Sequence, residues 1–528
     1  MADALDLKSK DLLKGRVGST PTSDTPKCRK LDDDCMNRIA VVGAGISGLA
    51  TAWYLTRDGH RVEVFEAQDR IGGVIATLEA DFTGSNLGDR LLIECGADNF
   101  ATLMPDAWDL VRQMGLESEF ITPKKDYRIA QVVCRGRLYP IPNGFSLMQP
   151  TRMGSILATP ILSVSGKLRV LKEAFVPAKR DSQDESVESF AVRRLGRECF
   201  ERLVEPIVGG IFTAKADKLS MQAAMPQFLR MEREHGSLIR AAFAKRRQQT
   251  AENRSAREAS GARYDQFTAP KLGMKWWLGK LAEPLGESLH LNHRVETLER
   301  DGDSTWTLRV VNQTDKSSRI ERFDKVCLAV PSYAAGSLLR NIDGVLAGGL
   351  ESIQYASSAI AVLALRRDEI RPEALCFGSI APTIEKRNCL AVSLSSEKYA
   401  GRCPEDTVIM RAFMGGAVRP ELLEHSDEKL LELAFAEVKA LFGIRTRPSY
   451  QRLVRWNRAM PQYEVGHVQR VASIREQISK YPGLALAGNA YDGVGIPQCI
   501  RGAKQAATML GTRVLKHRDT ESTEFGAS

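Results

Sequence analysis

The sequence lacks any apolar run of about 18 residues, the length that a helix needs to cross the hydrocarbon core of a bilayer. Residues 1–36 also lack the apolar segment of a secretory signal. They mix Ser, Thr and Pro with charges of both signs and end in Asp32, Asp33 and Asp34, so a disordered tail is predicted there, and a second tail at residues 516–528. We therefore expect a cytoplasmic protein with at most peripheral contact with a membrane.

Patterns that bind metals are missing as well. The ten cysteines are scattered and form no C-x-x-C pair, and the seven histidines form no cluster at the spacing of metal ligands. Reduced cysteines and no metal site are therefore predicted. The net charge of +9 is well below the density of basic residues that is typical of nucleic-acid binders, so no nucleic-acid partner is expected.

What is present is a long globular chain with one strong motif near its start. Its 528 residues, 43% of them hydrophobic, are enough for two or three domains. The motif begins in a β-branched run at Arg38 and continues as V-V-G-A-G-I-S-G-L into a predicted helix. Gly43 permits the tight turn, Gly45 allows the backbone to approach a pyrophosphate, and Gly48 allows the helix to pack closely on the sheet.

A second predicted strand at residues 62–65 strengthens this interpretation. It ends in Glu66, roughly 20 residues beyond the glycines, where a carboxylate accepts a hydrogen bond from a ribose 2′-OH. Near the C-terminus, a buried strand at residues 484–487 meets Gly488 and Asn489 and leads to a helix that begins near Pro497. This predicts a second helix N-terminus at the same nucleotide, and hence a nucleotide domain built from discontinuous segments.

The rest of the chain alternates between strand-rich and helix-rich parts. A hairpin at residues 132–141 is predicted to turn at Arg135 and Gly136, and residues 147–263 are mostly helical. One strand is predicted at residues 289–298, and the runs at 355–365, 392–395 and 407–413 predict a largely antiparallel sheet. A turn-rich segment is predicted from Trp456 to His467.

Two parts of the helical block leave alternatives open. The segment from Met148 to Leu171 mixes apolar with basic residues, which suits either an interfacial helix pair or buried packing inside the domain. The segment from Ala241 to Ala262 is rich in Arg, Lys, Gln, Glu and Ser, and predicts an exposed helix or a mobile loop.

Several longer motifs carry a family resemblance. After Glu66 comes A-Q-D-R-I-G-G, which resembles the flavoprotein version of the nucleotide motif. Three further motifs are R-R-L-G-R-E-C-F-E-R-L-V-E-P-I-V-G-G-I-F-T-A with the following K-L-S, M-P-Q-Y-E-V-G-H, and A-G-N-A-Y-D-G-V-G-I-P-Q-C-I. Together, in this order, they resemble the oxygen-dependent, FAD-containing protoporphyrinogen oxidase family of the flavin amine oxidase superfamily. The resemblance extends from about Arg38 to Leu515.

The resemblance implies an α/β fold with three parts. These are a Rossmann-like FAD-binding domain at residues 37–105, 265–345 and 470–515, an α+β substrate domain with a mostly antiparallel sheet at 106–146 and 346–469, and a helical, possible membrane-contacting subdomain at 147–264. The implied activity is the six-electron oxidation of protoporphyrinogen IX to protoporphyrin IX in haem biosynthesis by FAD and molecular oxygen. Coproporphyrinogen III is an alternative substrate, and a homodimer and transfer of the product to a chelatase are compatible with the resemblance. An amine oxidase, a phytoene desaturase-like enzyme and an inactive flavin carrier are the competing hypotheses.

The resemblance also implies site residues. Asp98 matches a position near the flavin and is the candidate for proton handling, although Asp98 and Asn99 equally suit an Asx turn. Phe377, Ile380 and Phe413 match positions that sandwich the macrocycle. Where the family places an arginine for a substrate propionate this chain has Ala130, so Arg128, two residues away, is the candidate, with Lys215, Arg135 and Arg137 as alternatives. The implied FAD contacts are Gly43, Gly45, Ile46, Ser47, Gly48, Glu66, Ala67, Arg70, Gly72, Gly73, Gly96, Ala97, Val295, Trp456, Gly488, Asn489, Gly495 and Ile496.

Overall fold

The computed structural model describes residues 37–81, 90–248, 266–302 and 305–512. Both predicted tails, and most of the segment Ala241–Ala262, lie outside the described residues. Within the described part of the chain, no helix is long and apolar enough to cross a membrane.

A parallel sheet forms the centre of the nucleotide-binding half. Its short strands are rich in Val, Ile and Leu, as expected for strands that are covered on both faces. In the described residues the strand order is β12 (Leu289–His290), β2 (Arg61–Phe65), β1 (Arg38–Val42), β16 (Lys325–Leu328) and β22 (Leu484–Leu486). Because these strands come from widely separated parts of the chain, the structure confirms a Rossmann-like domain built from discontinuous segments.

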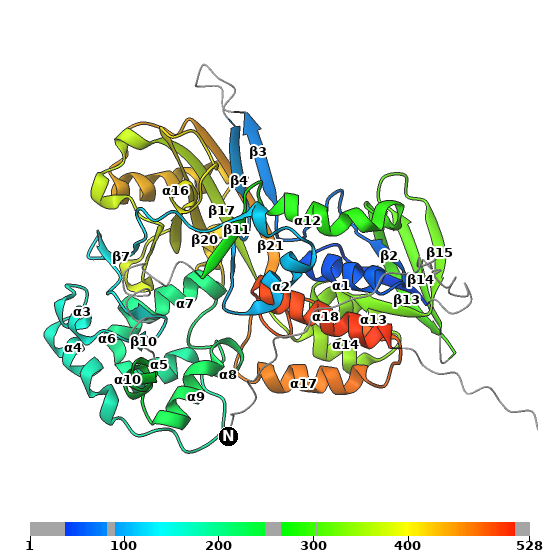
Figure 1. Cartoon of the computed structure of the whole chain (residues 1–528), viewed down its shortest axis with the longest axis horizontal. Coiled ribbons are helices and arrows are strands. Elements are labelled where there is room, and N and C mark those ends of the chain that lie inside the picture. The colour runs from blue at the N-terminus through cyan, green and yellow to red at the C-terminus, as the bar shows by residue number, and fades with distance from the viewer. Residues whose placement is uncertain (1–36, 82–89, 249–265, 303–304, 513–528) are drawn as a thin grey trace, which may run out of the picture. The chain divides into compact units, whose positions relative to one another are not determined.

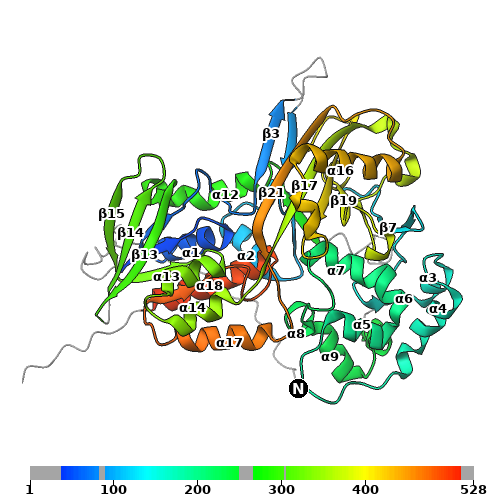
Figure 2. The same cartoon turned by 180° about the vertical axis from the view of Figure 1, so that it is seen from behind.

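Each face of this sheet has its own cover. One face packs against α1 (Ile46–Arg57), α2 (Pro105–Gln113), α12 (Met274–Ala282) and α18 (Ile496–Gly511). Figure 1 shows α1 and α18 side by side, although they come from opposite ends of the described chain. The other face packs against β13 (His293–Asp301), β14 (Thr305–Asn312), β15 (Ser318–Phe323), α13 (Ser332–Leu339), α14 (Gly344–Glu351) and α17 (His467–Ile478), which Figure 2 shows from behind.

The second large sheet is mostly antiparallel, as predicted. Only the β18–β7 pair is parallel within the described strands. The order is β21 (Tyr450–Pro461), β17 (Tyr355–Arg366), β20 (Thr407–Gly415), β19 (Ala391–Leu394), β18 (Gly378–Ile380), β7 (Ala130–Cys134) and β8 (Arg137–Pro140). The β7–β8 hairpin turns at Arg135 and Gly136, both with positive φ, which confirms the predicted turn.

Strand β20 illustrates how this sheet faces two environments. Val408, Met410 and Ala412 pack toward α16 (Asp427–Phe442), which covers one face of the sheet. Ile409 and Phe413 pack on the opposite face, together with residues of β4 (Arg90–Glu94). Since alternate residues of a strand share a face, Arg411 points the same way as Ile409 and Phe413, toward the nucleotide-binding half.

The helical block has a core of its own. Its elements are α3 (Met153–Ala158), α4 (Val164–Leu171), η3 (Lys172–Phe175), α5 (Val187–Leu195), α6 (Arg197–Cys199), the π-helical turn η4 (Phe200–Val204), α7 (Glu205–Phe212), α8 (Met221–Ala224), α9 (Pro226–His235) and α10 (Leu238–Gln248). A buried ion-pair network joins them, since Arg194 and Glu173 are both 0% exposed and Glu232 is 3% exposed. The carboxylate of Glu173 also accepts hydrogen bonds from the backbone N–H groups of Leu238 (2.9 Å) and Ile239 (3.1 Å) at the start of α10.

The segment Met148–Leu171 is partly buried and partly exposed, so buried packing accounts for one face of it, and the interfacial alternative stays a prediction. Ile156, Ile161, Leu162 and Val170 are buried in the helical core. In contrast, Leu157, Val164 and Leu168 are exposed, and Phe175 of η3 just beyond is 80% exposed. The segment therefore has a buried apolar face and an exposed one.

Two predictions of secondary structure were wrong. The segment from Trp456 is not turn-rich as far as Pro461, because β21 runs to Pro461 and pairs with β17. As an edge strand of the described sheet, β21 tolerates a proline. The single strand predicted at residues 289–298 is divided between two sheets, β12 and β13.

The remaining short elements connect the larger parts. The short strands are β3 (Thr77–Asp81), β5 (Phe100–Ala101), β6 (Phe120–Ile121), β9 (Phe145–Ser146), β10 (Gln149–Pro150) and β11 (Phe267–Pro270). The short helical turns are η2 (Glu117–Glu119), η5 (Glu283–Ser288), η6 (Arg367–Glu369), η7 (Pro372–Ala374), η8 (Thr383–Glu385), α15 (Ser395–Lys398) and η9 (Pro420–Glu424).

Candidate active site

The first glycine-rich turn lies between β1 and α1. A Cβ atom at Gly48 would lie 1.9 Å from the carbonyl oxygen of Gly43, so only glycine allows this approach of helix and turn. A Cβ atom at Gly45 would meet no described atom within 4 Å, which shows open space above that residue. The turn is thus closed on its protein side and open at Gly45.

Two helices begin at this open side. The N-caps of α1 and α18 are Gly45 and Gly495, and neither described N-terminus has a side-chain cap. The first turns meet, because Ser47 lies within hydrogen-bonding reach of Cys499, whose pKa burial raises to about 11. Ile46 and Ile496 are buried in the same core. Backbone N–H groups of both helices are therefore available to an anion at one place.

Glu66 lies beside the turn, at the end of β2. It is 9% exposed, and its carboxylate accepts hydrogen bonds from the N–H groups of Ala44 (2.7 Å) and Gln68 (2.9 Å). A carboxylate has further lone pairs, which can accept from a ribose hydroxyl. Ala67 next to it is exposed, and Val295 follows two residues after His293, whose N–H donates to the Glu66 carbonyl (2.7 Å).

A second group of predicted residues is joined to the same turn. The N–H of Gly72 donates to the carbonyl of Ala44 (2.8 Å), and the guanidinium of Arg70 donates to the carbonyl of Gly73 (2.7 Å). Arg70 also lies over the ring of Trp456, 5.6 Å from its centroid.

Trp456 connects this group to the loop that follows β4. Its Nε1 donates to the carbonyl of Cys95 (2.7 Å). Gly96 and Ala97 follow directly and are at least partly exposed. Trp456 therefore joins the second glycine turn to the segment that carries Asp98.

The C-terminal turn has a support that sequence analysis did not identify. The hydroxyl of Tyr463 donates to the carbonyl of Asn489, and its ring stacks on His467 with centroids 4.2 Å apart. Burial lowers the pKa of His467 to about 4, so this imidazole is neutral at physiological pH. Tyr463 thus fixes the Gly488–Asn489 turn through its hydroxyl, and the His467 ring stacked on it carries no charge.

These features fit FAD. The two uncapped helix N-termini suit a pyrophosphate, the open space at Gly45 gives it room, and the carboxylate of Glu66 suits a ribose. Arg70, Trp456 and Cys95 form a chain of contacts from the second glycine turn to the loop that carries Asp98, which was predicted to lie near the isoalloxazine ring.

Asp98 lies in a buried cluster of charges. Its Oδ2 accepts a hydrogen bond from Nη2 of Arg411, and the ammonium nitrogen of Lys398 is 3.5 Å from the same oxygen. Burial opposes ionisation of Asp98, but the positive charges of Arg411 and Lys398 outweigh it and keep the pKa of this carboxyl below its usual value. Asp98 is therefore held as a carboxylate, and its predicted role in proton handling stays a prediction.

Arg411 also fixes the loop that precedes Asp98. Its Nη1 donates to the carbonyls of Glu94 (3.0 Å) and Gly96 (2.8 Å). Glu94 itself is 1% exposed, and burial raises its pKa to about 7. A charged residue in the apolar run V-I-M-R-A-F-M of β20 is the sequence signal that could have identified Arg411.

The predicted substrate residues fall into different places. Ile380 and Phe413 share one cross-strand row of the large sheet, with Ala391 between them, and both keep part of their surface exposed. Phe377 is 3% exposed and presents almost no surface. Arg128 donates from its guanidinium to the carbonyls of Lys124 (2.7 Å) and Pro123 (2.8 Å), so it holds its own loop.

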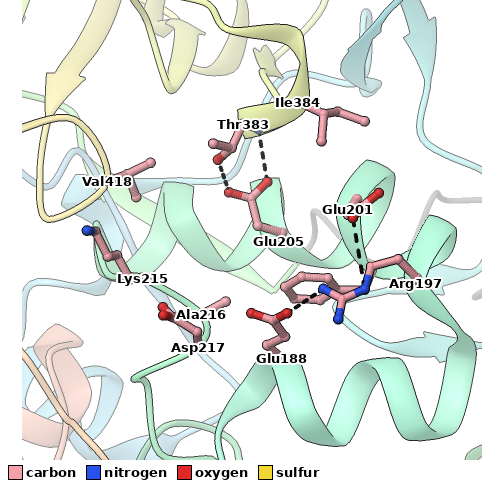
Figure 3. A pocket seen from close by; sticks show the side chains of 11 residues that line it. Glu188, Arg197, Glu201, Glu205, Lys215, Ala216, Asp217, Thr383, Ile384 and Val418 are labelled. Atoms are coloured by element: carbon pink, nitrogen blue, oxygen red, sulfur yellow. Dashed lines mark hydrogen bonds and ion pairs between the residues drawn. The ribbon is translucent and has the colours of Figure 1, made fainter.

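Lys215 lies at a pocket away from Asp98 and Phe413, which Figure 3 shows. This cavity of about 370 Å³ lies between the helical block and η8, and Lys215 is one of its exposed lining residues. Glu205 points across it to Thr383, whose backbone N–H donates to the carboxylate (3.1 Å). Burial raises the pKa of Glu205.

Comparison with known proteins agrees with this geometry. The profile of the family described as flavin containing amine oxidoreductase matches residues 46–510. A coproporphyrinogen III oxidase from Propionibacterium freudenreichii is 31% identical, over 89% of this chain and 90% of its own. Protoporphyrinogen oxidase 2 of Arabidopsis thaliana is 26% identical, over 90% of this chain and 93% of its own.

A solved structure is similar over the same extent. It is that of a protein from Exiguobacterium sp. 255-15, provisionally named a protoporphyrinogen oxidase, with a TM-score of 0.75 and 26% identity over 90% of this chain and 98% of its own. The predicted resemblance, fold class and cofactor are thus confirmed. With the glycine turns, the two helix N-termini and Glu66 in one place, and with a family match over most of its length, this chain belongs to the flavin containing amine oxidoreductase family, and its cofactor is FAD.

Proposed function

We propose that this chain catalyses the oxygen-dependent oxidation of protoporphyrinogen IX to protoporphyrin IX in haem biosynthesis. The observation that carries the proposal is the row formed by Ile380, Ala391 and Phe413 on one face of the large sheet, where Phe413 packs beside β4 and Ile380 packs beside the helical block. A flat, apolar macrocycle matches such a face. Curated relatives that match about nine-tenths of this chain are named as oxidases of porphyrinogens.

The chemistry belongs to the cofactor, and the chain supplies binding, orientation and a protected site. When bound, FAD would supply two-electron oxidation with oxygen as the final acceptor; removal of six electrons and six protons from the porphyrinogen would need three such cycles and would yield three molecules of hydrogen peroxide. The helix N-termini at Gly45 and Gly495 hold the phosphates. Trp456 and Arg411 fix the Cys95–Asp98 loop, and the sheet row orients the macrocycle.

Coproporphyrinogen III is the second candidate substrate. It carries two more carboxylates than protoporphyrinogen IX, in place of two vinyl groups. It is favoured by the relative that is 31% identical, which is named a coproporphyrinogen III oxidase.

The test is an oxidation assay with each substrate. The purified holoprotein is incubated without oxygen with protoporphyrinogen IX or coproporphyrinogen III, and porphyrin fluorescence and hydrogen peroxide are followed after air is admitted. We expect the holoprotein to raise porphyrin fluorescence faster with one of the two substrates than with the other. It should form three molecules of peroxide for each porphyrin. FAD-stripped protein, before and after reconstitution, is the control. A holoprotein with bound FAD that accelerates neither reaction would refute the proposal.

Peripheral contact with a membrane is proposed for the helical block. The support is the exposed set Leu157, Val164, Leu168 and Phe175, which alternates with Lys167 and Lys172. Sedimentation with vesicles that contain anionic lipid should retain the protein, and Val164→Ser with Phe175→Ser should release it.

A cytoplasmic location, a homodimer and transfer of product to a chelatase are proposed on the family resemblance, and molecular mass in solution tests the dimer.

A further inference from the structure

The basic residues predicted to bind a substrate carboxylate are poorly placed for it. Arg128 donates to the carbonyls of Lys124 and Pro123. Arg135 and Arg137 are exposed at the β7–β8 turn. Strand β8 lies four strands from β20, or roughly 19 Å at the usual strand spacing. Arg135 and Arg137 therefore lie beyond the Ile380 end of the row, away from Phe413.

Lys398 is better placed than any of them. It ends the short helix α15, directly after β19, and its side chain keeps 22% of its surface exposed. Burial lowers the pKa of Lys398, while the nearby Asp98 opposes this shift. The charge of Lys398 is also felt at Cys376, next to Phe377, and its carbonyl accepts from the N–H of Lys124 (2.8 Å). Lys398 therefore lies close to three segments: the loop that carries Asp98, the segment at Cys376 and Phe377, and the loop from Lys124 to Arg128.

The buried cluster around Lys398 has more positive than negative groups. Lys398, Arg402 and Arg411 are its cations, and Asp98 and Glu94 are its acids. Arg402 is 1% exposed and donates to backbone carbonyls at 2.9 Å. Because burial raises the pKa of Glu94 to about 7, this acid is only partly ionised near neutral pH. The cluster therefore carries a net positive charge that one further anion would neutralise.

Neighbouring groups do not remove this excess. Glu397 is 1% exposed, but it forms its own ion pair with Arg367 (2.5 Å). Ser393 of β19 is the cross-strand partner of Arg411 of β20, so both side chains lie on the same face of the sheet. The hydroxyl of Ser393 is buried, at 7% exposure of the residue, and has no hydrogen-bond partner among the described residues. A buried hydroxyl without a partner, next to an excess of cations, suits a bound anion.

We propose that Lys398 binds a carboxylate of the substrate, while Asp98, which Arg411 fixes, holds its ammonium group in place. This inference rests on the proposed function, because it takes the substrate to be a carboxylated macrocycle. The ammonium group has three donors, and its ion pair with Asp98 at 3.5 Å is long for a hydrogen bond, so donors remain for a second carboxylate. Lys398 is thus a substrate-binding residue that selects for peripheral carboxylates.

The distance between the cation and the apolar surface matches such a ligand. Arg411 and Phe413 are two residues apart on one face of β20, or roughly 7 Å along the strand. Lys398 lies beside Arg411 through their shared carboxylate oxygen. A porphyrinogen carries its carboxyethyl groups at the rim of the macrocycle, so a ring that covers Phe413 can extend a carboxylate to Lys398.

The experiment compares Lys398→Met with Lys398→Arg, and uses Lys439→Met, at an exposed lysine of α16, as the matched control. KM and kcat are measured with the porphyrinogen that the wild-type protein oxidises, together with FAD content. We expect Lys398→Met to raise KM roughly ten- to one-hundredfold, as for the loss of a charge-assisted hydrogen bond, with kcat and FAD content little changed. Lys398→Arg should restore most of the affinity, and Lys439→Met should resemble the wild type. A KM for Lys398→Met within twofold of wild type would overturn the proposal.

A binding experiment separates this inference from the proposed function. Coproporphyrin, which is already oxidised, and its neutral tetramethyl ester are titrated into the wild-type holoprotein and into Lys398→Gln, with flavin fluorescence as the signal. We expect coproporphyrin to bind the wild type at least tenfold more tightly than it binds the variant, and the ester to show no such difference. Equal binding of coproporphyrin to both proteins would refute the role of Lys398, even if the oxidation assay succeeds. A clear difference would support it, even if neither porphyrinogen is oxidised.

Discussion

Replacement of Asp98 by asparagine separates a structural from a catalytic role for this residue. In the wild type, Arg411 and Lys398 share one oxygen of the Asp98 carboxylate. Asparagine has nearly the same shape but no charge, so it leaves two buried cations without their common partner. Loss of one member of a buried ion pair costs about 3–5 kcal/mol of stability. We expect a value near the lower end, because Arg411 keeps its bonds to the carbonyls of Glu94 and Gly96.

The assay is urea unfolding of the flavin-saturated proteins at neutral pH, arranged as a double-mutant cycle. Its members are the wild type, Asp98→Asn, Arg411→Met and the double variant. Because the second substitution removes the cation that the first leaves unpaired, the double variant should be destabilised by at least about 2 kcal/mol less than the sum of the single variants. Residues without direct contact would give values that add within a few tenths of a kcal/mol.

The pH dependence gives a second measure of the same interaction. Burial opposes the ionisation of Asp98, yet Arg411 and Lys398 lower its pKa in the folded protein. The unfolded chain therefore takes up the proton first as the pH falls. The stability that Asp98 contributes is present above its ordinary pKa, near 3.9, and is lost as the pH falls below that value toward the lower folded pKa. The wild type should lose this contribution in acid, whereas Asp98→Asn has none to lose.

One result would refute this reasoning. If Asp98→Asn keeps the stability and the acid sensitivity of the wild type but abolishes turnover with FAD still bound, Asp98 handles protons, as predicted from sequence, and the ion pair contributes little. If stability falls while the residual folded enzyme keeps its kcat, Asp98 is a positioning residue. The two outcomes differ in both readouts.

Further predictions concern the cofactor turn and two buried groups. Glu66→Ala should weaken FAD retention by about 1.5–3 kcal/mol, measured as flavin content after gel filtration. Gly45→Ala should fold normally but lose FAD, because its Cβ would point into the open space where the pyrophosphate is expected. Gly48→Ala should destabilise even the apoprotein, because its Cβ would lie 1.9 Å from a backbone oxygen. Thermal unfolding of both apoproteins checks this difference. Burial raises the pKa of Glu94 in the folded protein from 4.5 to about 7. The stability of the wild type should therefore fall by up to about 3 kcal/mol as the pH rises between these values. Urea unfolding across this pH range should show no such slope for Glu94→Gln. Arg194→Met leaves the buried carboxylate of Glu173 without its ion-pair partner, whereas Glu232 keeps Arg193, and should cost about 3–5 kcal/mol, visible as faster proteolysis of the helical block.

The cofactor half was predictable because its signals are local. Gly43, Gly45 and Gly48 lie within one turn, and each is required by a contact of its own neighbours or of the ligand. The hairpin at Arg135 and Gly136 was predictable for the same reason, since two consecutive positive φ angles define its turn. Such constraints are encoded in a few adjacent residues and need no knowledge of the tertiary fold.

The substrate side was less predictable because its signals are not local. Asp98, Lys398 and Arg411 are brought together only when the β4 loop meets the large sheet. Arg128 was the natural candidate from spacing, but its loop folds back and uses the guanidinium for two carbonyls. Likewise, α2 was assigned to the substrate part, but its apolar face (Ala107, Leu110, Val111) packs into the core of the nucleotide half.

The loop from Glu94 to Asp98 belongs mechanically to both halves of the site. Its carbonyls accept from Arg411 of β20 and Trp456 of β21, while its start, at Glu94, caps the first turn of α12 through the N–H of Met274 (2.9 Å). The loop therefore links the nucleotide-binding half directly to the large antiparallel sheet. A change in the large sheet at Arg411 must move the same backbone that is predicted to face the flavin. Loss of Arg411 should consequently alter FAD retention as well as substrate affinity, whereas loss of Lys398, which bonds only to the Asp98 side chain in this loop, should alter substrate affinity alone.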